Sequence, residues 1–272
     1  MVYCTWISDD CLAPLMPLAP NYWSTLPLRK GVRILNRDAR GLAALEKPVG
    51  TLSHPNKPGE EPRALLTCPY DEKRECFHWP RETAPDGTVI REAGELFLMN
   101  RLDSATSGVL LVAADAELAR LIRGQFAKRG VSKTYAAMVF GVPRTRRDVW
   151  EDRLSVKKKG GQIRGDTHGH IESKSEMRHL GTRAGQPAVS LIELQPSTGR
   201  SHQLRLHCQR HSLPIVGDAT YGDFPRNKAY AKVTGVKRLL LHSFHTSVRY
   251  NWEGRDWEFE ATSPLPPEFS IV

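Results

Sequence analysis

Apolar and polar positions alternate most clearly in the middle of the chain. Residues 96–99 and 108–112 form short apolar runs that predict buried strands, and the polar segment 100–107 lies between them. A further strand is predicted over 133–140, with Tyr135 on one of its two alternating faces. Because a polar loop between two buried strands is held at both ends, we expect residues 100–107 to be firmly positioned.

The same pattern predicts two helices and several shorter strands. Asp115 is a suitable N-cap for a helix over 116–129 that Gly130 ends, and Ser201 is a suitable N-cap for a short helix over 202–211. Further strands are expected over 32–36, 42–50, 76–79, 89–90, 188–195 and 238–248, followed by a hairpin that pairs 249–252 with 256–261. Interleaved short strands with few helices predict an α+β fold, whose core is a mostly antiparallel mixed sheet with a few flanking helices.

The chain of 272 residues is expected to form one domain over 31–272, preceded by an extended arm over 1–30. Prolines interrupt the arm repeatedly, and it lacks any periodic pattern. Its start has neither the basic residues nor the apolar run of a signal peptide. The longest apolar run, 109–114, is far shorter than the roughly 20 residues that a membrane-spanning helix needs. We therefore expect a cytoplasmic protein without a membrane segment.

Basic residues outnumber acidic ones, 39 to 30, which gives a formal net charge of +9. This balance favours a polyanionic partner such as nucleic acid, although a basic surface also serves solubility. The segment 144–165 concentrates the excess and includes Lys157, Lys158 and Lys159, which form either an RNA-contacting hairpin or a solvated face. The five cysteines include no C-x-x-C pair, so reduced thiols are expected.

Two polar segments carry candidate chemistry. Asp103 lies in the loop between the central strands, where backbone amides and hydroxyls can hold an ionised carboxylate in place; the residue can equally be an ordinary turn aspartate. Arg205 lies inside the short predicted helix between two leucines, so it is expected to be buried and to need an acidic partner, for which Asp103 is the candidate. Arg200 precedes the same helix, and an arginine beside a helix N-terminus suits an anion.

These segments resemble the pseudouridine synthases of the RluA type. The stretch RLDSATSG from Arg101 to Gly108 resembles the catalytic motif, and KTY ending at Tyr135 resembles the motif that supplies an active-site tyrosine. The stretch TGRSHQLR ending at Arg205 resembles the third motif, and the likeness extends from about residue 34 to about residue 264. Asn100 stands where the catalytic motif usually has His.

The resemblance implies a pseudouridine synthase fold and an enzyme that isomerises a specific uridine in structured tRNA or rRNA, without cofactor or metal. Asp103 would be the nucleophile and Arg205 its ionic partner, while Tyr135 would stack on the uracil and could remove the proton on carbon 5. We expect a monomer. The resemblance and the basic segment together indicate eight candidate substrate-binding residues. These residues are Arg101, Thr106, Arg200, His202, Gln203, Lys157, Lys158 and Lys159.

Two other functions are compatible with parts of the sequence. A non-catalytic RNA-binding protein could use the same fold, but the presence of Asp103, Tyr135 and Arg205 favours the enzyme. A metal-dependent hydrolase acting on RNA would need clustered ligands. His207 and His211 lie four residues apart in the predicted helix, yet their spacing indicates no third ligand, so no metal site is expected.

Overall fold

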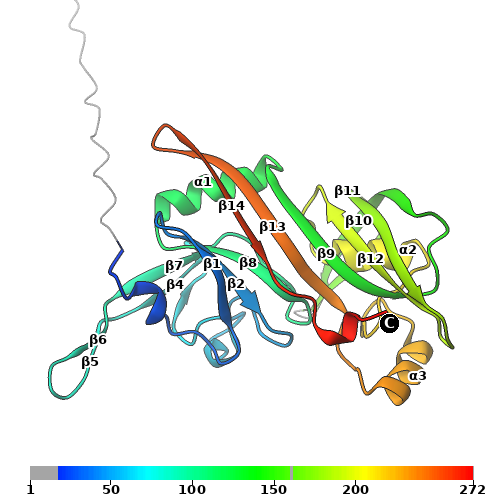
Figure 1. The fold of residues 1–272 in the computed structure, drawn as a ribbon, viewed down its shortest axis with the longest axis horizontal. Coiled ribbons are helices and arrows are strands. Elements are labelled where there is room, and N and C mark those ends of the chain that lie inside the picture. The colour runs from blue at the N-terminus through cyan, green and yellow to red at the C-terminus, as the bar shows by residue number, and fades with distance from the viewer. Residues whose placement is uncertain (1–17, 160–161, 272) are drawn as a thin grey trace, which may run out of the picture.

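The computed structural model describes residues 18–159 and 162–271, with residues 155–159 and 162–170 described by their backbone only. A curled sheet of 12 strands forms the centre of the molecule (Figure 1). Its main path runs through β10 (Arg147–Lys159), β11 (Gln162–Arg183), β12 (Val189–Pro196), β9 (Val131–Phe140), β13 (Leu241–Trp252), β8 (Ser107–Ala113), β7 (Gly94–Leu98), β4 (Cys76–Trp79) and β3 (Tyr70–Asp71).

Five further strands and three helices complete the described fold. Strands β2 (Leu42–Lys47) and β14 (Arg255–Thr262) pair with β8 and β13, β1 (Arg33–Arg37) extends β2, and β5 (Glu82–Thr83) forms a separate hairpin with β6 (Val89–Arg91). The described pairings are antiparallel except that of β8 with β13. The helices are α1 (Ala116–Ala127), α2 (Gln203–Arg210) and α3 (Phe224–Thr234). The predicted α+β fold with a mostly antiparallel sheet is confirmed.

Strand β9 separates two hydrophobic layers because its side chains alternate between the faces of the sheet. Ala137 and Val139 pack on the side of Leu204 and Cys208 from α2, and Tyr135 packs against the same cluster. The residues between them pack on the opposite side, with Tyr230 of α3 and with Phe269; they are Ala136, Met138 and Phe140. Helices α2 and α3 therefore cover opposite faces of this part of the sheet.

The observed helix boundaries correct two predictions. Asp115 caps α1 as expected, accepting a hydrogen bond from the Leu118 amide (2.8 Å), but α1 ends at Ala127. The chain turns there because Arg129, rather than Gly130, takes a left-handed conformation with φ of 61°. Helix α2 begins at Gln203, and its N-cap is His202 in a left-handed conformation with φ of 56°, so Ser201 is not the cap.

Several further elements differ from the sequence pattern, among them the strands β10 and β11, which it did not predict. The strand expected from residue 238 begins at Leu241. Helix α3 was not expected, although Asp223 caps its start by accepting a hydrogen bond from the Arg226 amide (3.0 Å) and Gly235 ends it in a left-handed conformation. Tyr230 is the only residue of α3 that is buried, and its sequence accordingly shows no apolar periodicity from which a helix could be predicted.

The arm predicted over 1–30 is described only from Leu18 onward. Trp23 and Leu26 are buried in a cluster with residues of β4 and β7, and the Tyr22 hydroxyl donates a hydrogen bond to the Glu95 carbonyl. The described part of the arm therefore lies against the sheet. Among the described cysteines, Cys68, Cys76 and Cys208 are buried and unbridged, while Cys4 and Cys11 lie outside the described residues. No described helix combines the length and apolarity needed to cross a bilayer.

Candidate active site

A cleft of about 570 Å³ opens where three segments meet: the loop between β7 and β8, the start of β9 with the end of α1, and the loop leading into α2. Eight of the residues predicted from the sequence line it. They are Arg101, Asp103, Thr106, Tyr135, Arg200, His202, Gln203 and Arg205. Lys157, Lys158 and Lys159 belong to the backbone of β10, but their side chains lie outside the described part of the structure, so their role stays a prediction.

The loop that carries Asp103 is fixed from three directions. The Ser53 hydroxyl bonds both the amide and the carbonyl of Leu102 (3.0 and 2.8 Å), and the fully buried Lys47 ammonium donates to the Ser104 carbonyl (3.1 Å). Asn100 accepts a hydrogen bond from the Leu111 amide of β8 through its Oδ1 (2.9 Å). An asparagine thus anchors the loop to the sheet at the position where RluA-type motifs usually have His.

Arg205 joins two carboxylates. Its Nη1 donates to Asp103 Oδ2 at 3.1 Å, and its Nε and Nη2 donate to the two oxygens of Asp218 at 2.8 and 2.7 Å. Asp218 is the buried partner, with its side chain 1% exposed, whereas the Asp103 side chain is 29% exposed. The expectation that Asp103 would be the buried partner of Arg205 is therefore corrected: Asp218 holds the guanidinium bidentately, and Asp103 takes one remaining donor.

The environment of Asp218 keeps it ionised. Burial by itself would raise the pKa of Asp218, but the Arg205 guanidinium and the amides of Tyr221 and Thr220 outweigh it, so the pKa lies below its usual value. Asn227 of α3 holds the loop around Asp218, since it accepts from the Gly217 amide (2.7 Å) and donates to the Asp218 carbonyl (3.1 Å). Asp218 lies within the stretch over which the family likeness extends, but the sequence did not indicate this role.

His202 and Tyr221 complete the surroundings of Asp103. His202 Nδ1 is 2.8 Å from the Tyr221 hydroxyl, and its Nε2 is 3.7 Å from Asp103 Oδ1. Burial lowers the pKa of His202, which favours a neutral imidazole at neutral pH. The Arg205 guanidinium carbon lies 4.9 Å from the centre of the Tyr221 ring, so a cation–π contact with Tyr221 also holds Arg205 in place.

Tyr135 lines the floor of the cleft with its ring against the cluster beneath α2. Burial, with a further contribution from the negative charge of Asp103, raises the pKa of Tyr135 to about 12. A raised pKa favours the protonated phenol at neutral pH. The environment therefore suits a stacking role and works against the expected role of Tyr135 as a base.

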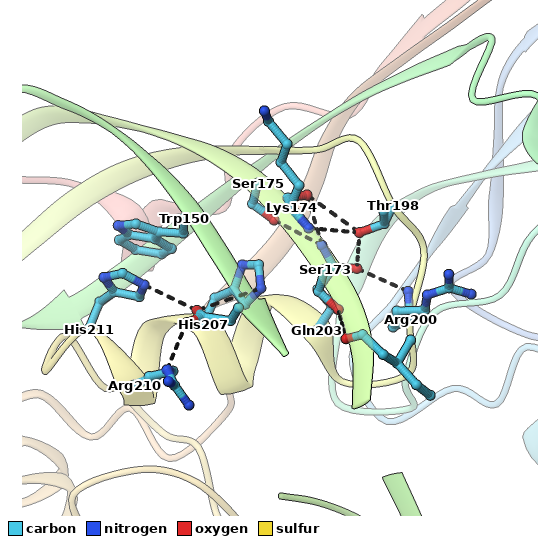
Figure 2. A network of polar contacts seen from close by, with 12 residues as sticks. Trp150, Ser173, Lys174, Ser175, Thr198, Arg200, Gln203, His207, Arg210 and His211 are labelled. Carbon is cyan, nitrogen blue, oxygen red and sulfur yellow. Dashed lines mark hydrogen bonds and ion pairs between the residues drawn. The ribbon is translucent and has the colours of Figure 1, made fainter. Parts of the chain in front are cut away.

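Gln203 is committed to the protein itself. Its amide nitrogen donates to the Lys174 carbonyl and the Ser175 hydroxyl, both at 3.0 Å, and its amide oxygen accepts from the Thr198 hydroxyl (2.8 Å) and the Arg200 amide (3.0 Å) (Figure 2). These contacts use the full hydrogen-bonding capacity of the side chain. We therefore correct its expected role: Gln203 fixes the loop before α2 rather than binding substrate.

The opposite end of α2 is held by a second network (Figure 2). Asp152 of β10 accepts from Arg210 Nε at 2.7 Å and lies 3.1 Å from His211 Nε2, and the ring of His211 stacks on Trp150 with centroids 4.5 Å apart. His207 is fully buried beside Asp152, with its Nε2 3.8 Å from Asp152 Oδ2. Within the described residues, no group of three or more His, Cys, Asp or Glu side chains has the arrangement of a metal site.

Comparisons with known proteins agree with this arrangement. A family model described as RNA pseudouridylate synthase matches residues 41–210. The chain is 36% identical over 220 residues to the tRNA pseudouridine synthase C of Haemophilus ducreyi, across 77% of this chain and 82% of that relative. It is 33% identical over 181 residues to the ribosomal large subunit pseudouridine synthase C of Vibrio vulnificus, across 66% of this chain and 55% of that relative. The structure of human RNA pseudouridylate synthase domain containing 1 shares the fold, with a TM-score of 0.60 at 22% identity, covering 88% of this chain and 86% of that one.

Proposed function

This chain belongs to the RNA pseudouridylate synthase family, as an RNA pseudouridine synthase of the RluA type, and on that premise we propose that it isomerises one specific uridine of a structured tRNA or rRNA with Asp103 as the nucleophile. The observation that carries the proposal is the position of Asp103. Its carboxylate is held by one donor of Arg205 and still faces the cleft.

The isomerisation breaks the bond between C1′ of the ribose and N1 of the uracil and forms a bond between C1′ and C5. The C5 proton is lost and N1 regains a proton, so the product has the composition of the substrate. Asp103 would attack either C1′ or the uracil ring. On C1′, the bond to the carboxylate breaks as the C1′–C5 bond forms. On the ring, it breaks after the C1′–C5 bond has formed, when the C5 proton leaves and the ring double bond is restored. The base must be flipped out of its stack to reach the cleft.

Arg205 would keep Asp103 ionised and oriented. Because Asp218 holds the guanidinium through two other nitrogens, Arg205 stays in place whether or not Asp103 carries its charge. An Asp103 carboxylate engaged in a covalent bond would therefore not release Arg205 from the site. Tyr135 would stack on the uracil from the floor of the cleft, with its hydroxyl protonated.

The relatives named above are described as acting on tRNA or on the large ribosomal subunit. We extend both possibilities to this chain, because either RNA offers structured regions with accessible uridines. A map of pseudouridines in cellular RNA, with and without this gene, would identify the substrate by the position that disappears.

The variant Asp103→Asn tests the mechanism on that RNA. It keeps the shape and hydrogen bonding of the side chain but removes the charge, so the single-turnover rate should fall by far more than tenfold while RNA affinity and melting temperature stay near wild type. The exposed Asp86, changed to Asn, is the matched control and should keep full activity. A rate for Asp103→Asn within about tenfold of wild type, equivalent to about 1.4 kcal/mol in the barrier, would contradict the nucleophilic role.

A further inference from the structure

Four cations line the cleft without an ion pair among the described residues: Arg101, Arg129, Lys133 and Arg200. Arg101, Arg129 and Arg200 are exposed, where water solvates a guanidinium. Lys133 differs because it is half-buried on β9, two residues before Tyr135 and on the same face of the strand. Among the cleft cations, Lys133 is therefore the one whose placement has an energetic cost that the described protein does not offset.

Among the described residues, no carboxylate forms an ion pair with the Lys133 ammonium. Burial is the cause that lowers the pKa of Lys133. The loop before α2 lies directly opposite, since a Cβ atom placed on Gly199 would be 3.9 Å from Lys133 Nζ. Gly199 has no side chain, so the space in front of the ammonium stays open toward the cleft.

A desolvated cation without a partner is unfavourable unless a ligand supplies the missing anion. The anion that RNA brings to this cleft is the phosphodiester. Two residues along a strand span about 6.6 Å, so the Cα atoms of Lys133 and Tyr135 are about that far apart. A nucleotide whose base rests on Tyr135 would therefore carry its own phosphate toward Lys133.

We propose that Lys133 binds the phosphodiester adjacent to the flipped uridine and so sets the position of its ribose relative to Asp103. The inference rests on the proposed function, because it requires the uracil to occupy the cleft beside Tyr135. Gly199 leaves room for the phosphate, and Arg200 lies next in the loop, on the same rim of the cleft. Lys133 would thus position the substrate through an electrostatic contact with the phosphate.

The test measures RNA affinity across a series of salt concentrations, using an unmodified transcript of the RNA that mapping identifies. Lys133→Met should weaken binding about tenfold and lower the slope of log affinity against log salt by roughly 0.7 to 0.9, the contribution of one phosphate contact. Lys133→Arg should restore most of the slope. Lys232→Met removes one exposed lysine from α3, on the opposite face of the sheet, and should leave the slope unchanged.

Two further measurements locate the contact. Replacing the phosphodiester on either side of the target uridine by a neutral methylphosphonate should weaken wild-type binding at one of the two positions, and Lys133→Met should show no further loss there. Gly199→Val keeps the lysine but fills the space before it, so it should weaken binding in the same way. This variant keeps the test decisive if Lys133→Met does not fold.

A wild-type salt slope in folded Lys133→Met, or additive effects of the variant and the methylphosphonate, would overturn the proposal. In contrast, a failure of the nucleophilic role would show as residual activity of Asp103→Asn with the salt slopes unchanged. The two proposals therefore fail by different observations.

Discussion

The two ends of α2 use the same chemistry for different purposes. At the cleft end, Arg205 contacts Asp103 at 3.1 Å, and at the other end Arg210 contacts Asp152 at 2.7 Å. The Asp152 side chain is only 6% exposed and lies against His211, whose ring stacks on Trp150. The Asp103 side chain is 29% exposed and faces the cleft.

The difference shows how a reactive carboxylate can be kept available. Asp152 and Asp218 have their oxygens occupied by arginine, histidine or backbone donors, so they hold the structure together. Asp103 receives one donor from a guanidinium that is already anchored elsewhere. The carboxylate least used by the scaffold is therefore the one with oxygens free to react.

Removing each arginine in turn should have very unequal effects. Arg205→Met leaves Asp218 buried without its partner, so we expect a loss of about 3 to 5 kcal/mol in the free energy of unfolding, together with loss of activity. Arg210→Met should cost about 1 kcal/mol or less, because Arg210 is 42% exposed and Asp152 keeps His211. Urea unfolding and single-turnover assays measure both effects. Equal losses would show that the two ends of α2 are equivalent.

The buried end of α2 should make stability depend on pH. Burial is the main cause that lowers the pKa of His207 to about 4, and neither of its ring nitrogens has a hydrogen-bond partner among the described residues. In the unfolded chain His207 binds a proton at about pH 6.5, so above that pH it is neutral in both states and does not lower the free energy of unfolding. As the pH falls from 6.5 toward 4, only the unfolded chain takes up the proton, and the free energy of unfolding falls by up to about 3 kcal/mol.

The variant His207→Leu isolates that contribution. It removes the titrating ring while Arg210 and His211 still hold Asp152, so its free energy of unfolding should fall less steeply than that of wild type between pH 6.5 and pH 4. Unfolding curves in urea at several pH values provide the comparison. Parallel pH profiles for the two proteins would rule out His207 as the source.

The smallest effect is expected from changes in the hairpin of β10 and β11, which carries Asp152, and it concerns RNA binding. Changing Lys157, Lys158 and Lys159 together to Ala should weaken binding similarly for different RNA sequences and flatten the salt dependence, by up to roughly 0.9 in slope for each phosphate that the hairpin no longer neutralises. The single-turnover rate at saturating RNA should stay near wild type, because the flipped base is held in the cleft. Wild-type affinity with a wild-type slope would mean that the hairpin is a solvated face and that RNA is held at the cleft.

Much of the fold could be predicted because period and capping are local properties. The strands around the polar loop and the N-cap Asp115 follow from neighbouring residues, and the structure has them where the pattern placed them. Helix α3 escaped prediction because it buries little, although Asp223 and Gly235 provided cap signals. The start of α2 escaped because its cap is a left-handed His202, which no propensity favours strongly.

By itself, the sequence determined the strands around the polar loop, the basic charge and the motifs that place Asp103, Tyr135 and Arg205 in one family pattern. Only the tertiary structure decided that Asp218 binds Arg205 bidentately and that the Gln203 side chain bonds β11 and the loop before α2. It also decided that Lys133 has no ion-pair partner among the described residues. Periodicity reports the local geometry of the backbone. The choice of a hydrogen-bond partner depends instead on distances between segments as far apart in the chain as Asp103 and Arg205, and those distances exist only once the sheet has brought the loops together.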